Sequence, residues 1–106
     1  MPNAKPLKPK RLELAAAVIL FDPGKIVATP AACELIRLSG VSHHELINRH
    51  VNGNFGDLGI DDVAANLHAI KSGLRIVSKY ELWGGAVYVI TEADRSSTCI
   101  LLLQEY

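Results

Sequence analysis

A polar, glycine-rich segment divides this chain into two parts with different sequence patterns: Arg49-His50-Val51-Asn52-Gly53-Asn54-Phe55-Gly56-Asp57-Leu58-Gly59-Ile60-Asp61-Asp62-Val63-Ala64-Ala65-Asn66. The segment contains three glycines, three aspartates, three asparagines, one histidine and one arginine. Glycine, asparagine and aspartate are typical of turns, and the end of the segment has the pattern of a helix start. The segment therefore predicts a turn that leads into a helix, and no other stretch of the chain is as rich in groups that are capable of chemistry.

The residues directly after the turn predict one helix. Asp61 is placed to cap its first amide groups. Val63, Leu67 and Ile70 recur at the spacing of one helical face, and Gly73 is a typical helix end.

An alternation of apolar and polar residues begins at Leu74 and predicts a strand that runs to Trp83. Gly84-Gly85 indicates a two-residue hairpin turn, and residues 86–91 then form the returning strand. After a polar turn, Thr98–Leu103 is almost continuously apolar, which is typical of a strand that is buried on both faces inside a sheet.

The residues before the segment predict a short strand at Lys25–Ala28 and two short helices. Thr29 and Pro30 favour the start of the first helix, and Gly40 favours its end. Residues 12–21 are apolar and suit either a buried strand or a helix.

Ser42 and Glu45 form a predicted capping box for the second helix, which should end near His50. The predicted fold class is α+β, with a three- to four-stranded, mostly antiparallel sheet and about three helices packed on one face. Residues 12–106 form a single predicted domain, and residues 1–11, which are rich in proline and lysine, form a predicted disordered tail.

The chain has no net charge, which argues against binding of nucleic acid by bulk attraction to phosphate. The charge is unevenly distributed, because residues 12–106 carry seven basic and eleven acidic side chains. The basic residues of the tail are Lys5, Lys8, Lys10 and Arg11. Binding of nucleic acid or anionic lipid by this tail is one interpretation, and a solvated terminus is the favoured one.

No segment is long enough to span a bilayer, and residues 12–21 lack the cleavage site of a signal peptide, so we expect a cytoplasmic protein. Cys33 and Cys99 lie in apolar segments outside any CxxC motif, and we expect both to be reduced and buried, with a disulfide as the alternative. No cofactor is expected, because the glycines match neither a dinucleotide-binding motif nor a P-loop.

Six polar residues form the candidate site: His50, Asn54, Asp57, Asp62, Asn66 and Arg95. In one interpretation Asp57 raises the pKa of His50 and fixes its tautomer, as for a general base, and Arg95 binds an anion in the same pocket. In the favoured interpretation, His50, Asp57 and Asn66 hold an irregular turn by hydrogen bonds to its backbone. A metal site built on His43, His44, His50 and Asp57 is not favoured, because no metal-binding spacing is present.

Three aromatic residues fall within or beside the predicted hairpin: Tyr80, Trp83 and Tyr88. They could form a stacking platform for nucleic-acid bases on one face of the sheet. Packing across neighbouring strands is the favoured interpretation.

Several motifs share their order and spacing with a known family: Thr29-Pro30, Arg49-His50, Gly53-Asn54-Phe55-Gly56-Asp57, Asp62, Asn66 and Ile90-Thr91-Glu92-Ala93-Asp94-Arg95-Ser96. On these motifs the chain resembles a family of small bacterial proteins found on plasmids and integrative elements, often labelled plasmid-related and sometimes labelled as subunit M of a type I restriction enzyme. The resemblance covers residues 25–106. This chain has Gly53-Asn54-Phe55-Gly56 where the family usually has Gly-Asp-Trp-Gly. The resemblance implies a mobile-element context and brings no established activity.

Two functions remain open. The favoured one is a non-enzymatic accessory protein of a mobile element that acts by binding a protein, such as an inhibitor of host defence of the anti-CRISPR or anti-restriction type. The alternative is a small enzyme or ligand-binding domain with a polar pocket around His50, Asp57, Asn66 and Arg95. A pocket in which these side chains converge favours the alternative, whereas a charged surface with His50 and Asp57 engaged by the backbone favours the binding protein.

Overall fold

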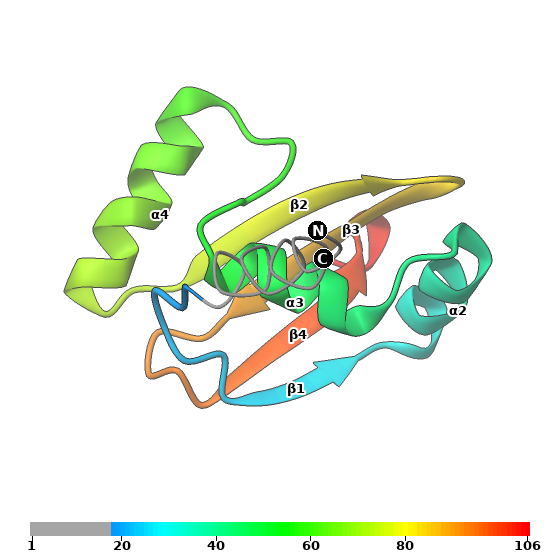
Figure 1. The fold of residues 1–106 in the computed structure, drawn as a ribbon, viewed down its shortest axis with the longest axis horizontal. Helices are drawn as coiled ribbons and strands as arrows, with labels where there is room; N and C mark the ends of the chain where they lie inside the picture. The colour runs from blue at the N-terminus through cyan, green and yellow to red at the C-terminus, as the bar shows by residue number, and fades with distance from the viewer. Residues whose placement is uncertain (1–17) are drawn as a thin grey trace, which may run out of the picture.

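The computed structural model describes residues 18–106, which form the α+β fold that the sequence predicts (Figure 1). The basic tail and residues 12–17 of the apolar segment lie outside the described residues. The described elements are β1 (Lys25–Ala28), α2 (Pro30–Ser39), α3 (His43–Val51), α4 (Ile60–Ser72), β2 (Ile76–Leu82), β3 (Gly85–Thr91), β4 (Ser97–Leu102) and a final turn of 3-10 helix, η1 (Leu103–Glu105). None of the described helices is long and apolar enough to cross a membrane.

The described strands form one mixed sheet in the order β1-β4-β3-β2. β2, β3 and β4 make the predicted antiparallel meander. β1 joins it in parallel to β4, with Lys25 opposite Ser97 and Ala28 opposite Ile100. The sheet therefore has β1 at one edge and β2 at the other, and Figure 1 shows these two strands at opposite borders.

One face of the sheet carries the core. Its buried side chains come from cross-strand partners: Ile76, Ser78, Tyr80, Val87, Val89, Thr91, Thr98 and Ile100. Ala32 and Ile36 of α2 and Leu46 and Ile47 of α3 pack in the same cluster. Full burial of a large aliphatic side chain contributes about 1.5–3 kcal/mol, so α2 and α3 are held mainly by this face.

The predicted starts of α2 and α3 are confirmed by their capping bonds. Thr29 Oγ1 accepts from the amide of Ala32 at 3.1 Å, and Gly40 ends α2 in the left-handed conformation. Ser42 Oγ accepts from the amide of Glu45 at 3.1 Å. Within the described residues, only this half of the predicted capping box forms.

α4 lies beside the start of β2 and differs from its prediction in two ways. Gly59 and not Asp61 is its N-cap, because the amide of Val63 already bonds to the carbonyl of Gly59 at 3.0 Å. The predicted apolar face is wrong at Leu67, which is 48% exposed, since α4 turns Asn66 and Ala69 toward the protein instead.

The β2–β3 turn consists of Trp83 and Gly84, one residue earlier than predicted, because Gly85 already pairs with Leu82. β4 is an interior strand, as predicted, but only one of its faces is buried. α2 and α3 pack on the core face, and the opposite face of β4 is only partly buried.

The three aromatic residues of the hairpin do not share a face, which excludes the stacking platform. Tyr80 is buried in the core, and Tyr88 lies on the opposite face against Tyr106, with the two rings edge to face at 5.4 Å. Trp83 is exposed in the turn.

The two cysteines are free thiols, as predicted, but both are half-buried rather than buried. Cys99 belongs to the partly open face of β4, and burial is the largest of the causes that raise its pKa. Cys33 Sγ lies 3.6 Å from His43 Nε2.

Candidate functional site

His50 is fully buried at the end of α3, and both of its ring nitrogens have hydroxyl partners on the sheet. Nδ1 lies 2.6 Å from Ser78 Oγ on β2, and Nε2 lies 2.8 Å from Thr91 Oγ1 on β3. The ring of Phe21 covers the imidazole edge to face, with the centroids 5.0 Å apart. His50 therefore joins α3 to the two strands that it crosses.

A chain of hydroxyl groups fixes the tautomer of His50. Thr98 donates to the carbonyl of Pro23 at 2.6 Å, so its oxygen accepts from Thr91, also at 2.6 Å. The oxygen of Thr91 then accepts from Nε2–H of His50, which leaves Nδ1 to accept from Ser78. Burial lowers the pKa of His50 from 6.5 to about 4, so the ring is neutral at physiological pH.

Asp57 does not contact His50, and the interpretation of these residues as a general-base pair is wrong. The Asp57 carboxylate is exposed, while its backbone amide donates to the carbonyl of Lys79 at 2.7 Å. The amide of Lys79 donates in turn to the carbonyl of Phe55 at 3.0 Å, so that the turn around Gly56 pairs with the outer edge of β2. Backbone pairing, and not the side chains of His50 and Asp57, holds the glycine-rich turn.

Asn66 closes the same edge of β2 from α4. Its Nδ2 donates to the carbonyl of Val77 at 2.8 Å, and its Oδ1 accepts from the amide of Val77 at 3.1 Å. Asn54 stays within the turn, where Oδ1 accepts from the amide of Gly56 at 3.3 Å and the backbone carbonyl accepts from the Tyr80 hydroxyl at 2.6 Å. Both asparagines are engaged by the fold, and Asn66 serves β2 rather than the turn.

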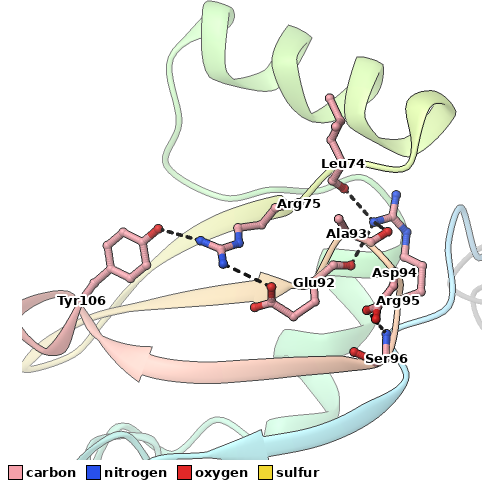
Figure 2. Close-up of polar contacts among 8 residues, drawn as sticks. All are labelled: Leu74, Arg75, Glu92, Ala93, Asp94, Arg95, Ser96 and Tyr106. Atoms are coloured by element: carbon pink, nitrogen blue, oxygen red, sulfur yellow. Dashed lines mark hydrogen bonds and ion pairs between the residues drawn. The ribbon is translucent and has the colours of Figure 1, made fainter.

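Arg95 lies in the turn between β3 and β4, and its guanidinium donates to backbone carbonyls (Figure 2). Nη1 reaches the carbonyls of Leu74, Glu92 and Ala93 at 2.7, 3.1 and 3.1 Å. Nη2 reaches the carbonyl of Ala69 near the end of α4 at 2.9 Å. Arg95 therefore ties the turn to α4, which corrects the prediction that it shares a pocket with His50 and binds an anion.

An open cleft of about 470 Å³ lies between α4, the turn before it and the face of the sheet opposite the core. We call it the α4 cleft. Three of the six predicted site residues line it, namely Asp57, Asp62 and Asn66. Its other polar or aromatic lining residues are Arg75, Lys79, Tyr88 and Tyr106.

The two sides of the α4 cleft differ in how their charges are paired. The exposed carboxylates of Asp57 and Asp62 make no hydrogen bond or ion pair with any residue in 18–106. On the sheet side, Arg75 donates to the carboxylate of Glu92 at 3.1 Å and to the hydroxyl of Tyr106 at 3.2 Å (Figure 2). The acidic side of the cleft is thus available to a ligand, whereas the guanidinium is already engaged.

Lys79 and the two tyrosines complete the sheet side. Lys79 Nζ lies 3.7 Å from the Glu81 carboxylate, and Tyr88 packs against Tyr106. The cleft therefore combines two unpaired anionic groups with an aromatic surface, an arrangement that suits a cationic group on an alkyl stem.

The sequence does carry a signal for Arg75 and Lys79. The alternation of residues 74–83 places both on the same face as Val77. Tyr106 and the approach of α4 to this face depend on contacts between distant segments. No local pattern marks Ser78 and Thr91 as the partners of His50.

No group of three or more His, Cys, Asp and Glu residues in the described part of the chain is arranged to hold a metal ion. Comparison of the chain with protein-family models, curated proteins and solved structures finds no match. The α4 cleft is therefore the feature of the described residues that bears on function.

Proposed function

We propose that this protein acts by binding a protein partner, and that the α4 cleft receives a lysine or arginine side chain of that partner. The unpaired carboxylates of Asp57 and Asp62 carry the proposal. A cation that enters the cleft meets both without breaking an existing ion pair, since Arg75 already binds Glu92. The aromatic surface of Tyr88 and Tyr106 suits the alkyl stem of a long basic side chain.

Binding without catalysis is favoured because the groups that a catalytic interpretation needs are engaged inside the fold. A general base needs a lone pair within reach of a substrate proton. Both ring nitrogens of His50 are bonded to buried hydroxyls, and the guanidinium of Arg95 is surrounded by backbone carbonyls.

The class of partner is proposed from the resemblance to proteins of plasmids and integrative elements. Host-defence proteins that act on nucleic acid need basic surfaces to bind phosphate. Residues 12–106 carry more acidic than basic side chains and are complementary to such a surface. We propose an inhibitor of host defence, of the anti-CRISPR or anti-restriction type, that covers a basic surface of its target.

The test is affinity capture from a bacterial host lysate with three baits: the wild type, the double variant D57N/D62N and the control D61N. Asp61 is the matched control because it also lies in the first turn of α4 but does not line the cleft. The wild type and D61N should retain the same protein, and D57N/D62N should lose it. Retention should also fall with added salt, because salt screens exposed charges.

Thermal unfolding of the three baits checks that they are folded to the same extent. A partner that all three baits capture equally would contradict the α4 cleft as the binding surface. Stabilisation of the wild type by a small molecule, with D57N/D62N unresponsive, would support the alternative of a ligand-binding domain.

A further inference from the structure

The two edges of the sheet are treated differently by the fold. The outer edge of β2 is closed, since Val77 bonds to the Asn66 side chain and Lys79 bonds to the backbone of Phe55 and Asp57. The outer edge of β1 pairs with no described residue. An unpaired edge presents free amide and carbonyl groups that favour pairing with another strand.

The hydrogen bonds of β1 to β4 determine which residues of β1 direct their backbone amide and carbonyl groups to the outer edge. The amide of Lys25 donates to the carbonyl of Ser96, and the amide of Thr29 donates to the carbonyl of Ile100, each at 3.0 Å. Alternate residues of a parallel strand direct their polar groups to the same neighbour, so Ile26 and Ala28 direct theirs to the outer edge.

The outer edge of β1 is also apolar. Ile26 is 46% exposed and Val27 is 41% exposed, although neither is at a chain end or in a loop. A groove of about 390 Å³ lies beside the strand and is lined by residues 26–28 of β1, by Cys33 of α2 and by His43, His44 and Ile47 of α3. Backbone groups and a largely apolar groove lie side by side, which is the arrangement used for the addition of a strand.

We propose that the outer edge of β1 pairs with β1 of a second copy of this chain, antiparallel and about a two-fold axis at Val27. The sheet then continues through both copies. Because Ile26 and Ala28 direct their polar groups outward, the register places Ile26 of each copy opposite Ala28 of the other.

This register is complementary in shape. Ile26 and Ala28 belong to the core face of the sheet, so Ile26 of the second copy lies beside Ala28, the smallest residue of the strand, and next to the groove at Ile47. On the opposite face, Val27 meets its own equivalent in a pair without hydrogen bonds, where side chains approach most closely.

The register is also complementary in charge. Lys25 stands at one end of β1 and makes no ion pair with a described residue. At the other end, Glu105 Oε1 accepts from Thr29 Oγ1 at 2.7 Å, which fixes an exposed carboxylate beside Thr29. Antiparallel pairing places Lys25 opposite Thr29 of the second copy and beside its Glu105, and the two-fold axis makes this contact twice. This arrangement favours a second copy over an unrelated strand.

Sedimentation velocity of the whole chain over a concentration series tests the proposal. The wild type should shift from 11.5 kDa toward twice that mass. I26K should raise the dissociation constant of the dimer by at least about tenfold, because it places a charge in the pairing edge. I60K is the matched control, since Ile60 is 86% exposed and remote from β1 in the sequence, and it should behave as the wild type.

A charge exchange tests the register. K25E should weaken the dimer, and K25E/E105K should be tighter than K25E, because the exchange restores opposite charges at this contact, although an ammonium group cannot accept from Thr29 Oγ1 as Glu105 does. Disulfide trapping gives a test that does not depend on stability: in a C33S/C99S background, V27C should form a crosslinked dimer under mild oxidation and I26C should not. The Cα atoms of a pair without hydrogen bonds are about 4.5 Å apart, within the range of a disulfide.

A wild type that stays at 11.5 kDa at the highest soluble concentration would overturn the proposal. A dimer that I26K and I60K affect equally would also overturn it. Crosslinking of I26C in preference to V27C would overturn the proposed register. A folded K25E/E105K variant that dimerises no more tightly than K25E would also overturn it. These outcomes do not depend on the α4 cleft, so the two proposals can fail separately.

Discussion

The side-chain amide of Asn66 makes both of its hydrogen bonds to the backbone of Val77, and so takes the place of a neighbouring strand at the edge of β2. Replacement by alanine should leave the partly buried amide and carbonyl of Val77 without these two hydrogen bonds and lower the free energy of unfolding by about 1–3 kcal/mol. N66D should destabilise more, because a carboxylate cannot donate to the carbonyl of Val77 and repels it.

Urea unfolding of N66A and N66D, with N48A as the control, checks this prediction. Asn48 is exposed on α3, and its side chain has no hydrogen-bond partner in the described part of the chain. Equal stability of N66A and N48A would show that the edge bonds of Asn66 contribute little.

His50 should make the stability of the protein depend on pH. Burial lowers its pKa from 6.5 in the unfolded chain to about 4, so the folded protein binds this proton less readily than the unfolded chain. The stability that comes from keeping His50 neutral is complete above the pKa of the unfolded chain, and it is lost as the pH falls through the pKa of the folded protein. This loss amounts to about 3 kcal/mol between the two pKa values.

The measurement is the unfolding free energy of the wild type, H50Q and the control H68Q across this pH range. H50Q cannot titrate, so its stability should fall less steeply with acid than that of the wild type, whatever its stability at neutral pH. His68 is exposed, and H68Q should keep the slope of the wild type. Parallel curves for the wild type and H50Q would contradict a neutral, buried His50.

Arg95 should be needed for the stability of the end of α4. R95A removes the donor to four backbone carbonyls and should lower the unfolding free energy by about 1–3 kcal/mol. R95K should recover only part of this loss, because an ammonium group cannot reproduce the fork of the guanidinium.

Hydrogen exchange gives the specific readout for Arg95. Amides in the last turn of α4 and in the β3–β4 turn should exchange faster in R95A, while those of α2 stay protected. R37A is the control, since Arg37 pairs with no described residue other than Glu34, on the exposed side of α2, and its removal should leave stability close to that of the wild type.

Gly56 and Gly40 allow backbone strain to be separated from a steric clash. Both have φ of 81°, a left-handed conformation that costs a residue with a Cβ about 1–2 kcal/mol. A Cβ at Gly40 meets no atom of residues 18–106, whereas a Cβ at Gly56 overlaps the carbonyl oxygen of Lys79 and lies 2.6 Å from the Tyr80 ring. G40A should therefore show the strain alone, and G56A should destabilise far more.

Thermal unfolding of G40A and G56A measures the difference. If the two variants melt at the same temperature, the turn is not held closely against β2. If G56A is much less stable, the close approach of the turn to Lys79 determines where the glycine-rich segment lies.

Local signals in the sequence predicted much of the fold. The helix start at Thr29, the helix end at Gly40 and the alternation of β2 each depend on neighbours within a few residues, and all three are confirmed. The start of α4 was misplaced because the turn before it is positioned by Lys79, which comes later in the chain. A prediction from Asp61 and its neighbours in sequence cannot include the contact of this turn with Lys79.

The candidate site was predictable only in part, for the same reason. Asp57, Asp62 and Asn66 are close in sequence, and all three line the α4 cleft. His50 and Arg95 were grouped with them by residue type, yet their partners are strand hydroxyls and backbone carbonyls that carry no sequence signature. A buried histidine and an exposed one look the same until the sheet order is known.

The parallel pairing of β1 with β4 has a consequence for the kinetics of folding. Short turns allow β2, β3 and β4 to associate early, because the loops that must close are small. β1 can dock only afterwards, when the chain between Lys25 and Ser97 has closed into a loop. Until then β4 is an edge strand with an apolar sequence and one unpaired edge. We therefore expect slow folding and early aggregation to have the same origin, the time during which β4 is not yet paired with β1.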